Sequence, residues 1–165
     1  MKQIILLSDT HNSLDERFVK YFKKADEIWH AGDIGSLEIT DKLKTYAPIK
    51  AVYGNIDNHT IRNQFKESLC FKCEKIKVLI THIGGYPNKY HAKSLLLIKK
   101  EKPDIFISGH SHILKVMYDK KNNLLHMNPG AIGNYGIHKV KTILSFKIDG
   151  KEIKDLNIIE FARKN

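Results

Sequence analysis

The sequence predicts an α/β fold in which two mixed β-sheets pack together and helices lie on the outside. In the first half of the chain, short apolar runs alternate with segments of helical pattern, as in parallel βαβ units. In the second half, apolar runs follow one another through hairpin turns, as in antiparallel sheets. The length of 165 residues matches one domain over residues 1–165, because no linker or repeat divides the chain.

The first half is expected to be βαβ-like, with Glu74-Lys75 as a turn between two of its strands. Strands are expected over residues 4–8, 27–30, 49–53, 68–71, 76–81 and 104–108. Helices are expected over residues 14–22, from 36 to the residues before Pro48, and over 89–101. Ser13, with Glu16 three residues later, has the pattern of a capping box for the first helix.

The second half is expected to be antiparallel. Its strands are expected over residues 114–118, 123–127, 140–148 and 153–159. Asn122-Asn123 and Asp149-Gly150 have the composition of hairpin turns between neighbouring strands.

The composition excludes several classes of protein. Two cysteines are too few for a disulfide scaffold or a four-thiolate zinc finger. No apolar run approaches the roughly 18 residues of a membrane span, and no secretory signal is recognisable, so we expect a cytoplasmic protein. The net charge of +10 comes mostly from scattered lysines, with only three arginines, which favours a solvated surface over a nucleic-acid footprint.

Five apolar runs end in side chains that can bind a metal. These side chains are Asp9 and His11, Asp33, Asn55, His82, and His110 and His112. Ligands of open α/β sheets bind beyond the carboxyl ends of the strands, so the five ends are expected to converge on one crevice. In extended stretches, residues two apart point to the same side, which pairs Asp9 with His11 and His110 with His112. Gly32, Gly54 and Gly109 allow close backbone approach just before the ligands.

The seven side chains offer oxygen and imidazole donors without a thiolate. Such a set suits Mn²⁺, our first expectation, with Ni²⁺, Fe, Zn²⁺ and Co²⁺ as alternatives. Seven ligands are too many for one ion, but they can be shared between two divalent ions with one carboxylate bridging.

The order D-x-H, G-D, G-N, T-H and G-H-x-H resembles the signature of calcineurin-like metallophosphoesterases, and Gly54-Asn55-Ile56-Asp57 and Asn128-Pro129-Gly130 resemble its small prokaryotic phosphodiesterase branch. The resemblance implies a four-layer αββα sandwich of two mixed sheets flanked by helices. It implies that Asp9, His11 and His112 hold one metal and that Asn55, His82 and His110 hold the other. Asp33 would bridge the two, and Asp33, Asn55 and His82 are our expected catalytic residues.

Two metals close together produce hydroxide at neutral pH, which would attack the phosphorus of a small phosphodiester in line with the leaving oxygen. Better-known phosphatases of the family carry a histidine after the Asn of the G-N motif, as the acid for the leaving group. Here that position is Ile56, which favours diesters over monoesters with poor leaving groups. Asp57 and His59 are candidate substitute acids and substrate contacts, and Asn12 is expected to orient ligands or substrate.

Two alternatives to an enzyme of small diesters stay open. A retromer subunit related to this family shares the fold and acts as a protein scaffold, although such scaffolds keep only part of the ligand set. Nucleic-acid binding or nuclease action is a less favoured alternative that rests on the charge of +10. Assembly into a homo-oligomer is also compatible with the sequence.

Overall fold

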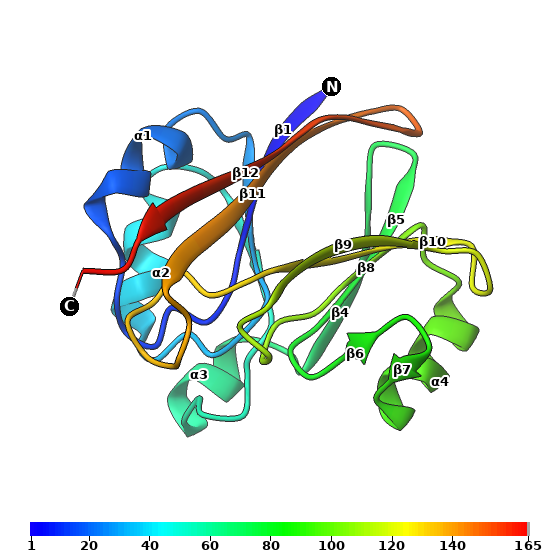
Figure 1. Cartoon of the computed structure of the whole chain (residues 1–165), viewed down its shortest axis with the longest axis horizontal. Coiled ribbons are helices and arrows are strands. Elements are labelled where there is room, and N and C mark those ends of the chain that lie inside the picture. Colours follow the sequence, from blue (N-terminus) through cyan, green and yellow to red (C-terminus); the bar gives the residue numbers. More distant parts are fainter. Residues whose placement is uncertain (165) are drawn as a thin grey trace.

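A computed structural model describes residues 1–164, and it shows two five-stranded mixed sheets that face each other (Figure 1). The first sheet has the order β12-β11-β1-β2-β3 and the second has the order β4-β5-β8-β10-β9. The first sheet comprises β1 (Lys2–Leu7), β2 (Glu27–His30), β3 (Ile49–Ala51), β11 (Val140–Asp149) and β12 (Glu152–Ala162). The second comprises β4 (Ser68–Cys73), β5 (Ile76–Thr81), β8 (Ile105–Ile107), β9 (Leu114–Asp119) and β10 (Leu124–Pro129).

Helices cover the outer faces of both sheets. They are a 3₁₀ turn (Glu16–Phe18), α1 (Val19–Phe22), α2 (Leu37–Lys44), α3 (His59–Gln64) and α4 (Ala92–Glu101). The 3₁₀ turn and helices α1, α2 and α3 pack on the outer face of the first sheet. Helix α4 packs on the second sheet, where its Ile98 contacts the core around Phe106 of β8. The four-layer αββα arrangement expected from the sequence is therefore confirmed.

The period of two along the strands separates the hydrophobic cores. In β1, Ile4 and Leu6 point into the core between the sheets, whereas Ile5 and Leu7 pack under the helices. These four side chains are at most 1% exposed. A continuous apolar run is thus a strand buried on both faces, and its end is fixed in position by both cores.

Three local expectations differ from the structure. The first helix begins at Glu16 rather than Leu14, because the Asp15 carboxylate accepts the backbone N–H of Arg17 and Ser13 belongs to the preceding turn. The helix expected from residue 89 begins at Ala92, since the residues before it form a small hairpin of β6 (Gly85–Tyr86) and β7 (Lys89–Tyr90). Helix α3 was not expected. No helix of the described residues is long and apolar enough to span a membrane.

Candidate metal centre

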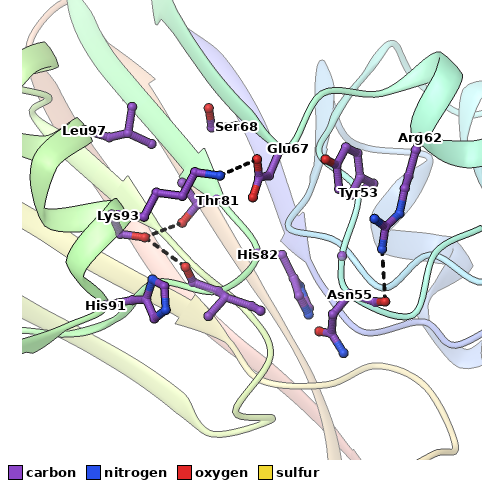
Figure 2. Close-up of a pocket in the computed structure, with 13 residues that line it drawn as sticks. Tyr53, Asn55, Arg62, Glu67, Ser68, Thr81, His82, His91, Lys93 and Leu97 are labelled. Atoms are coloured by element: carbon purple, nitrogen blue, oxygen red, sulfur yellow. Dashed lines mark hydrogen bonds and ion pairs between the residues drawn. The ribbon is translucent and has the colours of Figure 1, made fainter.

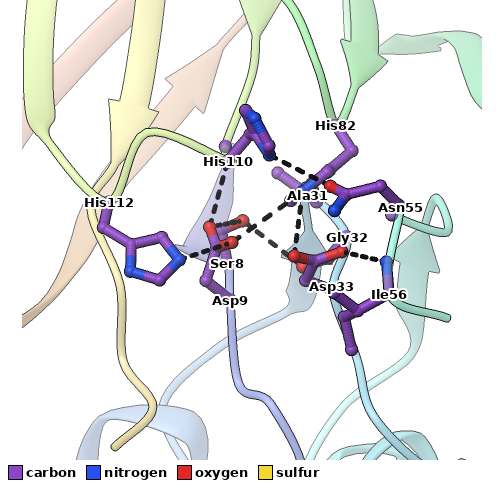
Figure 3. A network of polar contacts seen from close by, with 12 residues as sticks. Ser8, Asp9, Ala31, Gly32, Asp33, Asn55, Ile56, His82, His110 and His112 are labelled. Carbon is purple, nitrogen blue, oxygen red and sulfur yellow. Dashed lines mark hydrogen bonds and ion pairs between the residues drawn. The ribbon is translucent and has the colours of Figure 1, made fainter. Parts of the chain in front are cut away.

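The segments that follow the central strands of both sheets bring their polar side chains together in one network (Figure 3). The N–H of Asp9, after β1, donates to the carbonyl of Gly32, after β2, at 3.0 Å. The two sheets are joined there because His82 Nδ1, after β5, donates to the carbonyl of Ala31 at 2.7 Å. The N–H of Gly109, after β8, donates to the carbonyl of His82 at 2.9 Å. The expected convergence of strand ends is therefore present.

The ligand-type side chains form two adjacent groups. Within each group the ligand atoms lie within 4.8 Å of one another, and the groups are Asp9, His11 and His112, and Asp33, His82 and His110. Asp33 Oδ2 lies between the groups, 3.3 Å from His11 Nε2 and 3.2 Å from His82 Nε2. Asn55 joins the second group, since its Oδ1 lies 3.0 Å from His110 Nδ1. Each group has the number and type of donors that one transition-metal ion needs.

Three ligand atoms at this place are buried without a hydrogen bond. They are Asp9 Oδ1, His11 Nε2 and His82 Nε2. Buried polar atoms are normally paired, so three orphans aimed at one another fit bound cations. The bond from His82 Nδ1 to the Ala31 carbonyl leaves Nε2 of the neutral ring as the electron-pair donor.

The two carboxylates dominate the electrostatics of the centre. Burial raises the pKa of Asp9 and of Asp33. His11 and a second histidine beside each carboxylate lower these pKa values by more than burial raises them, so both lie well below the usual range. In return, the carboxylates of Asp33 and Asp9 raise the pKa of His11 to about 9. Burial opposes protonation of His82, yet the same carboxylates raise its pKa above the ordinary value. The site therefore attracts positive charge strongly, whether as protons or as metal ions.

Most of the candidate ligands have an unusual backbone. Five of them have positive φ: Asp9 at 55°, His11 at 43°, Asp33 at 55°, His110 at 67° and His112 at 59°. Left-handed backbone is uncommon for residues other than glycine and concentrates at functional sites.

The segment G-H-x-H is not extended, so strand alternation does not apply to its two histidines. His110 and His112 lie in a turn after β8 rather than in extended chain, and each belongs to a different group. Asp9 and His11 do share a group, but they reach it through the same left-handed turn geometry.

Two glycines are needed because the ligands occupy the space of a side chain. A Cβ atom at Gly54 would lie 2.0 Å from Oδ1 of Asp33. A Cβ atom at Gly109 would lie 2.2 Å from Ser8 Oγ and 2.9 Å from Asp9 Oδ2. The role expected for these glycines, close approach beside the ligands, agrees with this geometry.

The side chains expected to contact substrate are placed differently from one another. Asp57 is buried, and its carboxylate accepts the N–H groups of Ile34, Gly35 and Gly54 at 2.8–3.0 Å. We therefore revise its role from substrate contact or acid to support of the turns that carry Asp33 and Asn55. Asn12 Oδ1 accepts a hydrogen bond from Ser36 at the exposed rim of the centre.

His59 is exposed at the start of α3, and within residues 1–164 it makes no hydrogen bond to the centre. Nothing in this placement gives it the role of leaving-group acid that the sequence suggested.

Two further residues contribute to the centre, and only one of them lies in a sequence motif. Tyr135 stacks on the ring of His11, with centroids 4.8 Å apart and planes at 26°. Its loop is more than 20 residues from the nearest ligand in sequence, so only the fold could bring it there. Asn128, which the motif Asn128-Pro129-Gly130 does contain, donates to the Gly109 carbonyl and to Ser111 Oγ and so holds the loop of His110 and His112.

A pocket of about 270 Å³ opens beside the second group (Figure 2). Asn55 and His82 form the wall that it shares with the centre. Tyr53, Arg62 and residues of α4 form the other walls. This volume is close to the lower end of the roughly 300–1,000 Å³ of small-molecule sites.

Comparison with known proteins identifies relatives. The family model described as calcineurin-like phosphoesterase superfamily domain matches residues 1–151. A probable metallophosphoesterase of Methanothermobacter thermautotrophicus is 30% identical over 131 residues, 76% of this chain and 74% of that protein. A structure described as a novel archaeal phosphodiesterase has a TM-score of 0.70 at 23% identity, over 96% of this chain and 99% of that chain. Vps29 of Entamoeba histolytica complexed with zinc has a TM-score of 0.75 at 17% identity, over 98% and 99%.

Proposed function

The chain belongs to the calcineurin-like phosphoesterase superfamily, and we propose that it is a phosphodiesterase that uses two divalent metal ions. The family supports a metal-dependent hydrolase of phosphoric esters. The observation that carries the metal part of the proposal is the set of three buried ligand atoms without hydrogen bonds. Buried carboxylate and imidazole atoms without partners are expected where cations bind.

The residues divide between the ions according to the two groups. Asp9, His11 and His112 would hold one ion, and Asn55, His82 and His110 would hold the other. Asp33 would contact both, because its Oδ2 lies between His11 and His82. Manganese is the ion we expect first, with nickel, iron, zinc and cobalt as alternatives suited to the same donors.

Bound ions would supply an activated water and would neutralise charge that builds on the phosphate oxygens. The chain's own contribution is to orient and hold the ligands. Ala31 fixes the His82 ring through Nδ1, and the N–H of Ile56 donates to Asp33 Oδ1 at 3.1 Å, which leaves Oδ2 facing the centre.

The specificity for diesters rests on position 56. Ile56 places an aliphatic side chain, 46% exposed, where a histidine would protonate a leaving alkoxide. Leaving groups that are stable as anions are therefore favoured. A small-molecule phosphodiester is the proposed substrate class, and the structural likeness to an archaeal phosphodiesterase supports it.

The test is hydrolysis of bis(p-nitrophenyl) phosphate and p-nitrophenyl phosphate by chelator-treated protein, with each metal added back in turn. We expect diester turnover that requires metal. Because p-nitrophenolate is stable as an anion and needs no acid, the effect of Ile56 is measured with glycerol 2-phosphate, a monoester of an aliphatic alcohol. Its turnover should be lower by at least about 100-fold, the low end of what a general acid contributes. Asp33→Asn should abolish it, whereas Asp41→Asn, the same change on an exposed helix residue, should not. Equal turnover in both variants, or turnover that survives chelation, would contradict the proposal.

A protein scaffold is the second candidate, because the fold matches Vps29 over nearly its whole length. It predicts no turnover of either ester with any of the five metals, although metals still bind and raise the melting temperature. Metal-dependent turnover lost in Asp33→Asn excludes a purely scaffolding role.

A further inference from the structure

The pocket beside the second group of ligands contains more positive than negative charge. Its charged walls are Arg62 on α3, Lys93 on α4 and Glu67 between α3 and β4 (Figure 2). Lys93 Nζ lies 2.7 Å from Glu67 Oε2, and both side chains are more than half exposed. This pair is internally balanced, which leaves the Arg62 guanidinium as the unbalanced charge.

Arg62 is held in place by neutral groups. Its Nε donates to the Asp57 carbonyl at 2.7 Å, and Nη2 donates to the Asn55 carbonyl at 3.2 Å. The guanidinium lies 4.8 Å from the ring centroid of Tyr53. Within residues 1–164, no carboxylate pairs with it. Two contacts with backbone oxygen fix its orientation but leave its full charge, and the donors of Nη1, available to a ligand.

The position of the pocket determines which part of a substrate could reach it. Asn55 and His82 both line the pocket, and both belong to the metal centre, Asn55 through its contact with His110. A group in the pocket would therefore be attached to a phosphate at that centre. A pocket of this volume accommodates one substituent of modest size rather than a polymer.

We propose that this pocket binds the alcohol part of the diester that is retained after hydrolysis, and that it selects alcohols bearing a second anionic group such as a phosphate. This inference rests on the proposed phosphodiesterase function. An anion there would meet Arg62 directly and Lys93 at the pocket mouth, where Glu67 competes for the same lysine.

Two synthetic diesters that differ only in this anion test the proposal. Thymidine 3′-(p-nitrophenyl phosphate) is compared with the same compound carrying a 5′-phosphate. Both release p-nitrophenolate, and the 5′-phosphate stays on the retained alcohol. We expect kcat/KM of the wild-type protein to favour the 5′-phosphorylated compound by about tenfold at low salt and by little at 1 M salt, because salt screens partly exposed charges.

Variants of the exposed pair change the pocket charge without touching a candidate ligand. Glu67→Gln should raise the preference for the 5′-phosphate about threefold, and Lys93→Met should lower it about threefold, as expected for an exposed charge whose interactions are screened by water. Glu38→Gln and Lys99→Met are exposed changes of the same charge away from the pocket, and they should leave the preference unchanged. Arg62→Met should remove most of the preference.

Two results would overturn the inference: no preference in the wild-type protein, or pocket variants that behave like their controls. Failure of the proposed function gives a different result, namely no turnover of either compound. In that case calorimetry with thymidine 3′,5′-bisphosphate and thymidine 3′-monophosphate decides. The inference is supported if the bisphosphate binds more tightly than the monophosphate and if Glu67→Gln increases this difference while Lys93→Met and Arg62→Met decrease it. Equal binding of the two compounds rejects the inference.

Discussion

Metal-free protein should lose stability as the pH rises from 6.5 to 9, because the centre replaces missing cations with protons. Asp33 and Asp9 raise the pKa of His11 to about 9 from its ordinary value of 6.5. The folded chain therefore holds a proton that the unfolded chain releases in this interval. The stabilisation is fully present below pH 6.5 and is lost as the pH rises through about 9.

The magnitude follows from the size of this pKa difference. At full burial it corresponds to about 3 kcal/mol in the free energy of unfolding. The edge of the centre is open to solvent, which reduces this to about 2 kcal/mol. For a domain of this length the melting temperature should fall by about 4–8 °C. The raised pKa of His82 acts in the same direction. Burial lowers the pKa values of His30 and His126 to about 4, so their titration affects stability only below pH 6.5.

The assay is thermal unfolding of chelator-treated protein between pH 5.5 and 9.5, with and without added Mn²⁺. His11→Asn should flatten most of the decline, whereas His59→Asn, an exposed histidine outside the centre, should not. Added metal should remove the decline, since a metal-bound imidazole carries no proton, and metal binding at pH 7.5 should release at least one proton. Equal slopes in wild type and His11→Asn would refute the electrostatic reasoning.

Three further predictions concern the support of the ligands. Gly54→Ala should reduce diester turnover by at least about 100-fold, because its Cβ would lie 2.0 Å from Asp33 Oδ1; near-normal kinetics would show that Asp33 can move freely. Asp57→Asn should lower stability by about 2 kcal/mol in thermal unfolding, because one of its oxygens that accept the N–H groups of Ile34, Gly35 and Gly54 becomes a donor; an unchanged melting temperature would argue against it. Asn128→Ala should weaken metal affinity about 10- to 100-fold in calorimetric titration, since it releases the loop of His110 and His112; unchanged affinity would mean that the loop holds itself.

The sequence predicts this architecture well because both signals it uses are local. An apolar run such as Ile4–Leu7 needs burial on both faces wherever it lies, and Gly-Asp or Gly-Asn after such a run marks a turn at the strand end. Convergence of those ends then follows from the general topology of α/β sheets. The fold class and the meeting of seven scattered side chains could be predicted in this way.

Orientation within the turns could not be predicted, because it depends on backbone conformations that residue type does not specify. Alternation assumes an extended chain at His110 and His112, whereas both have positive φ and lie in different groups, a division that the family resemblance implied but that alternation did not. Asp57 has the residue type of a catalytic acid, and only its three N–H donors show that it supports two turns. Tyr135 reaches His11 through tertiary packing alone.

The strained ligand backbone also bears on how the centre is held together. Left-handed φ at five non-glycine residues costs on the order of 1 kcal/mol each, which in total approaches the stability of a small domain. The Asp57 carboxylate, which accepts the N–H groups of Ile34 and Gly35, holds the turn of Asp33, and the bond from Asn128 to the Gly109 carbonyl holds the turn of His110 and His112. Because these partners are protein groups rather than ions, the ligands stay in position when the carboxylates are balanced by protons instead of metal. The centre is therefore preorganised, and removing metal should abolish activity while the fold persists.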